Sequence, residues 1–188
     1  MRALARTIII TGFMGAGKTT VAAALAHRLR CRILDLDSLI EERSGRTPQE
    51  IIDGDGEKRF REIETEALRY ALSQGRAQVL ALGGGTWTMT ANRALINEQG
   101  ALTVWLDAPF ELCWRRVAGE RVSRPFARDE ESARLLYDAR REFYDQARLH
   151  VKVREDGTPE AVAAEIADAL SQNMKQDFNQ GRTERGTQ

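Results

Sequence analysis

The chain has little cysteine, no net charge and no long hydrophobic run. Its two cysteines, Cys31 and Cys113, have neither metal-ligand spacing nor a secretory context, which indicates reduced thiols in a cytoplasmic protein. The 28 basic and 28 acidic residues cancel, so the charge does not favour nucleic acid as a main partner. No stretch approaches the roughly 20 apolar residues of a membrane span, and we therefore expect no membrane partner.

The most informative motif is GFMGAGKT at residues 12–19, which reads G-x-x-x-x-G-K-T. Such a run between an apolar strand pattern and a helical pattern is typical of a phosphate-binding loop, or P-loop. Its glycines let backbone N–H groups turn inward around a di- or triphosphate, its lysine reaches the β- and γ-phosphates, and its threonine hydroxyl ligates Mg²⁺. The predicted nucleotide-binding residues are Gly12, Gly15, Ala16, Gly17, Lys18, Thr19 and Thr20. Kinases, GTPases, motors and regulatory sensors share the motif, so it does not define the reaction.

Short apolar runs alternate with longer helical patterns along the chain. Strands are predicted at 7–11, 32–36, 79–82, 103–106 and 150–153, and helices at 18–29, 38–43, 48–53, 57–72, 91–97, 110–117, 130–147 and 159–172. Strands separated by helices need crossover connections, which implies a parallel sheet covered on both faces. We predict one α/β domain at residues 1–172, with a three-layer α/β/α P-loop fold around a five-stranded parallel sheet. A polar tail at 173–188 is predicted to be disordered.

Two charged, irregular segments are candidates for ligand loops, which in such folds project from the carboxyl ends of the strands. Residues 38–64 are the expected acceptor-binding region, and residues 118–131 are the expected mobile lid. The alternative for both segments is a surface loop without a role.

Two acids, Asp35 and Asp37, close the second predicted strand. In an extended strand they share a face, and two neighbouring carboxylates are costly unless a cation or a bound donor uses them. One could hold Mg²⁺ through water while the other accepts a proton from an attacking hydroxyl. The alternative is that Asp37 only caps the helix predicted at 38–43, and spacing alone does not decide between the two.

Glycines and arginines supply the remaining candidates. Gly83, Gly84 and Gly85 follow the third strand, where they allow positive φ and a close approach of a ligand to the backbone, although an ordinary tight turn is the alternative. The planar fork of arginine suits carboxylates and phosphates, but a single arginine is more often part of a surface ion pair. The candidate arginines are Arg61, Arg124, Arg140 and Arg141.

Taken together and in this order, the motifs resemble the shikimate kinase family, which are P-loop kinases of the nucleoside-monophosphate-kinase type. The matching pieces are GFMGAGKT at 12–19, LDLD at 34–37, IEERSGRT at 40–47, GE at 56–57, FREIE at 60–64, LGGG at 82–85, Arg124-Pro125, and RREFY at 140–144. They extend over most of residues 8–170.

The resemblance implies transfer of a phosphoryl group from MgATP to the 3-hydroxyl of shikimate, on the route to chorismate and the aromatic amino acids. It also implies a cytoplasmic monomer. On the nucleotide side, Lys18 would hold the transferring phosphate, Thr19 would bind Mg²⁺, and Asp35 would support the metal through water. Arg124 would move in with the lid to stabilise charge on the phosphoryl group, and Arg116 would lie near adenine.

On the acceptor side, the resemblance assigns the shikimate contacts. Asp37 would bind the reacting hydroxyl and act as, or orient, the base. Arg61 and Arg140 would clamp the shikimate carboxylate, with Arg140 favoured over Arg141 by counting back from Tyr144. Backbone groups of Gly83, Gly84 and Gly85 would also meet the substrate.

Two other hypotheses remain at this point. Another small-molecule P-loop kinase, for gluconate or a nucleoside monophosphate, would share the architecture, but the paired acids and the glycine run argue against it. A non-catalytic nucleotide-binding module would be expected to have lost at least one of the residues named above.

Overall fold

Five parallel strands form one sheet in the part of the chain that the structure, a computed structural model, describes: residues 6–75, 77–118 and 129–183. The strands are β1 (Ile8–Thr11), β2 (Ile33–Asp35), β3 (Val79–Ala81), β4 (Leu102–Asp107) and β5 (Leu149–Lys152), in the spatial order β2-β3-β1-β4-β5. The helices are α1 (Lys18–Leu29), α2 (Leu36–Ser44), α3 (Pro48–Gln74), α4 (Thr90–Glu98), α5 (Phe110–Ala118), α6 (Glu130–Tyr144) and α7 (Pro159–Thr183), with a 3₁₀ turn, η1 (Thr86–Thr88). The predicted three-layer fold is confirmed.

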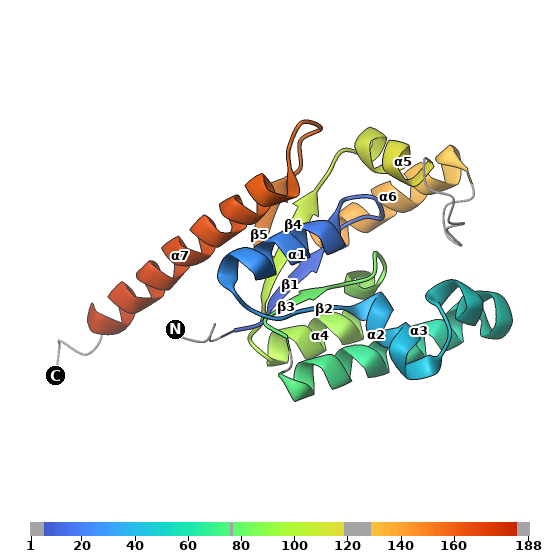
Figure 1. Cartoon of the computed structure of the whole chain (residues 1–188), viewed down its shortest axis with the longest axis horizontal. Coiled ribbons are helices and arrows are strands. Elements are labelled where there is room, and N and C mark those ends of the chain that lie inside the picture. The colour runs from blue at the N-terminus through green and yellow to red at the C-terminus, as the bar shows by residue number, and fades with distance from the viewer. Residues whose placement is uncertain (1–5, 76, 119–128, 184–188) are drawn as a thin grey trace.

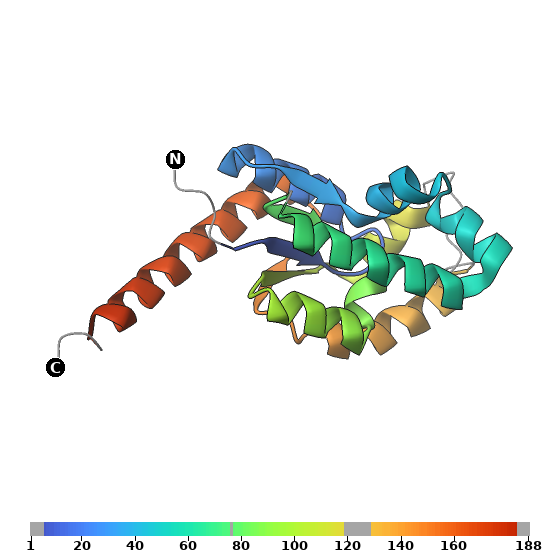
Figure 2. The same cartoon turned by 90° about the horizontal axis from the view of Figure 1, so that it is seen from below.

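The helices cover both faces of the sheet. Helices α1 and α7 pack together on one face, whereas α4 and α6 lie on the other (Figures 1 and 2). Helix α3 packs against both α2 and α4. All the strand pairings are parallel, so the carboxyl ends of the strands share one edge of the sheet. Loops from distant parts of the sequence therefore meet at that edge.

Strand β1 is the centre of the sheet. Ile8, Ile9 and Ile10 have exposed fractions of 1% or less, because strands flank β1 on both sides and helices cover both faces. Ile8 is in register with Val79 of β3 and with Leu102 of β4. The P-loop follows β1 directly, so it begins at the end of a strand that is buried and paired on both sides.

Helix α3 begins at a capping box and bends at a glycine. The Thr47 hydroxyl accepts a hydrogen bond from the Glu50 backbone N–H, the Glu50 carboxylate accepts one from the Thr47 N–H, and Pro48 opens the helix. Gly56, with φ 84° and ψ 163°, interrupts the helical backbone. The helices predicted at 48–53 and 57–72 thus lie end to end in one bent element.

Helix α7 is longer than predicted. It continues to Thr183, so the predicted helix end at residue 172 is wrong. The disorder of the polar tail stays a prediction. The polar composition suggested disorder, but residues 173–180 contain no glycine or proline, and such a sequence lets an established helix continue. Residues 184–188 lie outside the described part of the chain.

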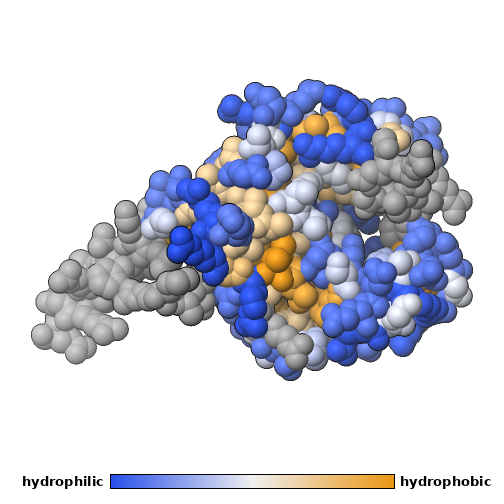
Figure 3. All heavy atoms as spheres, in the orientation of Figure 1, coloured by the Kyte–Doolittle hydropathy of each residue, from blue (hydrophilic) through white to orange (hydrophobic). Residues whose placement is uncertain are grey.

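The surface is mainly polar. On the face shown in Figure 3, hydrophilic residues surround a smaller area of apolar ones. The exposed large hydrophobic side chains among the described residues are Ile33, on the edge strand β2, and Leu135 on α6. Within the described ranges, none of the helices combines the length and the apolar character needed to cross a bilayer.

Candidate active site

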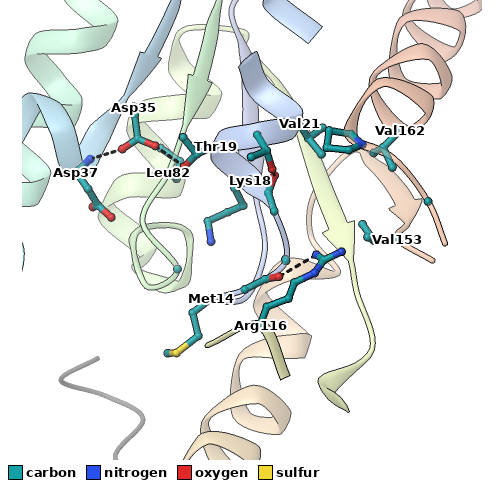
Figure 4. Close-up of a pocket in the computed structure, with 17 residues that line it drawn as sticks. Met14, Lys18, Thr19, Val21, Asp35, Asp37, Leu82, Arg116, Val153 and Val162 are labelled. Atoms are coloured by element: carbon teal, nitrogen blue, oxygen red, sulfur yellow. Dashed lines mark hydrogen bonds between the residues drawn. The ribbon is translucent and has the colours of Figure 1, made fainter. Parts of the chain in front are cut away.

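A cavity of about 520 Å³ opens where the P-loop leaves β1. Residues 14–21 of the loop and of α1 form one wall. Asp35 and Asp37, from the β2–α2 junction, and Leu82 and Gly84, from the segment after β3, line it from the other side (Figure 4). The cavity therefore lies at the carboxyl edge of the parallel sheet, where a ligand is expected.

Left-handed backbone angles shape the P-loop. The φ angles of Gly12, Gly15 and Gly17 are 144°, 75° and 89°, a region that other residues rarely adopt. A Cβ added at Gly12 would lie 2.9 Å from the carbonyl oxygen of Leu106, and one at Gly15 would collide with the carbonyl oxygen of Cys113. Only glycine fits these positions, and Gly17 leads directly into the first turn of α1. The glycines are thus required by the shape of the loop, and its binding of an anion stays a prediction.

Asp35 connects the start of α1 with the start of α2. Its Oδ2 accepts a hydrogen bond from the Thr19 hydroxyl at 2.7 Å. Its Oδ1 accepts bonds from the backbone N–H groups of Asp37 at 3.0 Å and Ser38 at 3.3 Å, which makes it the N-cap of α2 (Figure 4). Lys18 Nζ donates to the Phe13 carbonyl at 2.9 Å on the same side of the loop.

Asp37 does not lie on a strand. Strand β2 ends at Asp35, and Asp37 is in the first turn of α2, so the argument that strand alternation puts both acids on one face is wrong. The alternative that Asp37 caps the helix is also wrong, because Asp35 is the cap. Both carboxylates nevertheless line the cavity. Asp37 Oδ1 approaches the backbone of Gly83 so closely that a Cβ added there would lie only 2.9 Å from it.

Of the three glycines after β3, Gly83 and Gly85 serve close approach rather than unusual φ. None of Gly83, Gly84 and Gly85 is among the described residues with positive φ, so that part of the sequence prediction is wrong. A Cβ added at Gly84 would lie 3.5 Å from Arg140 Nη1, and one at Gly85 would lie 2.6 Å from Arg61 Nη2. The segment thus brings two guanidinium groups, from helices far apart in sequence, against neighbouring backbone units.

Arg61 is held by acids of its own helix. Its guanidinium pairs with Glu64 at 2.8 Å and Glu57 at 3.2 Å. Burial alone would lower the pKa of Arg61, but these carboxylates outweigh burial and raise it, so the group stays charged. Glu64 is 1% exposed and also accepts a 2.6 Å bond from the Thr86 hydroxyl.

Glu64 was not singled out from the sequence, although a signal was present. Phe60, Glu64, Ala67 and Leu68 follow the i, i+4, i+7, i+8 spacing of one buried helix face, and all four are buried. An acid on such a face must have partners inside the protein. The pattern therefore marks Glu64 as part of a polar network.

Arg140 and Arg141 have different environments. Arg140 is 8% exposed, and no ion pair between described residues includes it. Arg141 instead pairs with Asp107 at 3.1 Å, donates to the Tyr137 hydroxyl at 2.7 Å and lies 5.0 Å from the centre of the Trp105 ring. Of these two neighbouring arginines, Arg140 is therefore the buried one that faces the glycine segment.

Tyr144 lies beside Arg140 and also reaches the glycine segment. Its hydroxyl donates to the Gly84 carbonyl oxygen at 2.5 Å. Burial raises the pKa of Tyr144 to about 12, although the nearby Arg140 acts in the opposite direction. The hydroxyl thus keeps its proton and remains a donor near neutral pH. Sequence reasoning used Tyr144 only to set the register of the helix.

The other end of the cavity is more apolar. Val153, Gly157 and Val162, from the β5–α7 connection and α7, line it together with Arg116. Arg116 Nη1 donates to the Gly15 carbonyl at 3.1 Å, which holds this side chain over the P-loop (Figure 4). Arg124 and residues 119–128 of the predicted lid lie outside the described part of the chain.

The described residues contain no group of three or more His, Cys, Asp or Glu side chains placed to hold a metal ion by themselves. The hydroxyl of Thr19 and the carboxylate of Asp35, 2.7 Å apart, offer hard oxygen ligands at the start of α1. That small set suits Mg²⁺, which keeps several waters and shares its coordination with phosphates. The donors present fit a phosphate-bound magnesium ion.

Comparisons with known proteins agree on one family. The family model for shikimate kinase matches residues 14–171. A shikimate kinase of Geobacter sulfurreducens is 42% identical over 90% of this chain and 93% of its own length, and one of Cereibacter sphaeroides is 41% identical over 91% and 85%. Among solved structures, shikimate kinase from Acinetobacter baumannii in complex with shikimate has a TM-score of 0.83 at 33% identity, over 89% of this chain and 94% of that one.

The contact between Gly15 and Cys113 predicts that Gly15→Ala weakens MgATP binding by at least about tenfold, because the new methyl group must displace the loop. Gly75→Ala is the matched control: Gly75 has φ 56°, and nothing lies within 4 Å of an added Cβ. That variant should lose about 1–2 kcal/mol of stability from backbone strain alone and bind normally. Titration calorimetry and thermal unfolding separate the two effects, and normal binding by Gly15→Ala would contradict this packing.

Proposed function

Because this chain belongs to the shikimate kinase family, and is therefore an ATP-dependent kinase, we propose that it transfers the γ-phosphoryl group of ATP to the 3-hydroxyl of shikimate. The products are shikimate 3-phosphate and ADP. The observation that carries this proposal is the buried Arg140, which faces the glycine segment beside the P-loop cavity without a carboxylate partner among the described residues. Such a cation suits the carboxylate of a small acceptor.

On the nucleotide side, the P-loop backbone and Lys18 hold the β- and γ-phosphates. The Thr19 hydroxyl would bind Mg²⁺, and Asp35, whose Oδ2 lies 2.7 Å from that hydroxyl, would support the metal through water. When bound, Mg²⁺ neutralises charge on the phosphate oxygens. Arg116 and the apolar residues of the β5–α7 connection form the wall suited to the base.

On the acceptor side, Arg140 and Arg61 hold the shikimate carboxylate from two directions. Their guanidinium groups approach the backbone of Gly84 and Gly85 respectively, so a carboxylate placed there can accept from both. The carbonyl oxygens of residues 83–85 already accept hydrogen bonds from Thr86, Tyr144 and Thr88. The proposed backbone contacts to the substrate would therefore be made by N–H groups of this segment. Two arginines, rather than one, both bind the carboxylate and hold the ring in one orientation.

Asp37 is the group placed to accept a proton. It lines the same cavity as Lys18, and it lies beside the glycine segment where the acceptor ring is proposed to bind. An attacking hydroxyl between the two would give its proton to the carboxylate while its oxygen approaches the phosphoryl group that Lys18 holds. Arg124, carried by the lid, completes the charge stabilisation in this proposal.

The proposal also includes a monomer that works in the cytoplasm. The free thiols of Cys31 and Cys113 support a reducing compartment. One domain at residues 1–172, with the acceptor region at 38–64, is the corresponding organisation.

The direct test is ADP formation from MgATP with and without shikimate, with gluconate and nucleoside monophosphates as comparison acceptors. We expect rapid ADP formation with shikimate alone. A bound nucleotide without stimulation by shikimate would reject the acceptor but leave the nucleotide site standing.

Asp37→Asn tests the base. It should leave MgATP binding nearly unchanged, because Asp35 and not Asp37 holds Thr19, and it should lower kcat by at least about 10²-fold. Steady-state kinetics at saturating substrates, with nucleotide titration alongside, measure both effects. Turnover close to that of the unmodified enzyme would remove Asp37 from the mechanism.

Arg140→Ala and Arg141→Ala form a matched pair on adjacent positions of α6. Loss of the buried Arg140 should raise the KM for shikimate at least about tenfold, since hydrogen bonds to charged groups contribute about 1.5–3 kcal/mol. Arg141→Ala should change that KM much less, because Arg141 pairs with Asp107 of β4 instead of facing the glycine segment. The reverse result would mean that Arg141 is the clamp.

A further inference from the structure

Two hydrogen bonds join the turn after the glycines to the end of α6. The Trp87 indole N–H donates to the Phe143 carbonyl oxygen at 2.8 Å, and the Tyr144 hydroxyl donates to the Gly84 carbonyl oxygen at 2.5 Å. Trp87 and Tyr144 are each 1% exposed, so water does not compete for these bonds. We call this pair of bonds the η1–α6 tie.

A third helix holds the same turn. Arg93 of α4 donates to the carbonyl oxygens of Trp87 at 2.9 Å and Thr88 at 2.7 Å, and its guanidinium lies 5.3 Å from the centre of the Phe143 ring. Thr86, at the start of the turn, bonds to the buried Glu64. The turn η1 is therefore fixed to α3, α4 and α6 at once.

The η1–α6 tie lies next to the two arginines of the proposed clamp. Arg140 is one helical turn before Tyr144 on α6 and reaches the backbone of Gly84. Arg61 comes from α3 and reaches Gly85. The spacing of the two guanidinium groups thus depends on where the end of α6 rests against residues 84–87. The last carbonyls of a helix lack partners within it. The Phe143 carbonyl oxygen accepts one bond from the Gln146 backbone N–H, just past the helix, at 3.1 Å, and the Trp87 indole adds a donor from another part of the fold.

We propose that Trp87 is a positioning residue of the acceptor site. Its indole N–H holds the end of α6 where Arg140 and Arg61 can both donate hydrogen bonds to one carboxylate. The inference rests on the proposed function. Trp87 is not among the residues that line the nucleotide cavity in the described part of the chain, so its effect is expected on the acceptor and not on ATP.

Trp87 could instead only fill space in the core, and the two roles are separable. A buried indole N–H needs an acceptor in any protein, so the bond alone does not show a role in binding. Trp87→Phe keeps an aromatic ring and removes the N–H. If the ring is all that matters, this variant binds shikimate normally.

The experiment compares Trp87→Phe with the unmodified full-length enzyme. We expect the KM for shikimate to rise about 3- to 10-fold, the size of one lost hydrogen bond, with kcat and the KM for MgATP within about twofold. Trp114→Phe is the control. Trp114 lies on α5, away from the glycine segment, and stacks on Phe110 with ring centres 6.4 Å apart. For Trp114→Phe, all three kinetic constants should stay within about twofold of those of the unmodified enzyme.

Tyr144→Phe is the second variant, and it decides the question if Trp87→Phe does not fold. It removes the other bond of the tie, together with the hydrogen bond between the hydroxyl and Arg140, and should give the same selective rise in the KM for shikimate. An unchanged KM for shikimate in the folded variants, or a joint loss in kcat and both KM values, would overturn the proposal. Absence of shikimate-dependent ADP formation in the unmodified enzyme would instead refute the proposed function on which it rests.

Discussion

The site depends on a stretch of backbone that carries no side chains. Asp37 and Glu64 approach Gly83, and Arg61 approaches Gly85, to distances that a Cβ would obstruct, while Arg140 lies 3.5 Å from the position of a Cβ at Gly84. Buried charges are costly unless each finds a partner, and Arg61 finds its partner in Glu64. Arg140 has only the tyrosine hydroxyl beside it and no carboxylate among the described residues, so an acceptor carboxylate would complete the balance. The glycines thus leave the space that a ligand can occupy and let the charged side chains that it must complement come close together.

Asp35 links the two halves of this site through one side chain. One of its oxygens holds the threonine that begins α1, and the other caps α2, which carries Asp37. The position of the proposed base is therefore tied to the position of the phosphate-binding helix. Coupling through hydrogen bonds of 2.7–3.3 Å leaves little freedom between nucleotide and acceptor. An in-line transfer needs that kind of fixed separation.

The sequence was sufficient for the architecture and for the P-loop, because apolar runs, glycine spacing and helix caps are local signals. The sequence was not sufficient where a contact with a residue distant in the chain determines the local structure or the environment of a side chain. Asp37 reads as a strand residue, yet the edge strand β2 ends two residues earlier because Asp35 caps α2. The helical spacing around Glu64 indicates a buried acid, but only the fold reveals Arg61 and Thr86 as its partners. Arg140 lies against Gly84, whereas Arg141 pairs with Asp107. Both contacts are with residues outside α6, so the spacing of residues along α6 does not predict them.

The central place of β1 has a consequence for how the chain acquires its shape during synthesis. The strand pairs with residues 79–81 and 102–105, so it leaves the ribosome long before either neighbour exists. Pairing between such distant segments is slow, because the intervening chain must first be brought together. Strand β1 is thus synthesised before, and can be paired only after, the two strands that flank it. A nascent chain that stops before β4 carries the full GFMGAGKT motif but lacks one of the two strands that flank β1, including Leu106, which packs against Gly12.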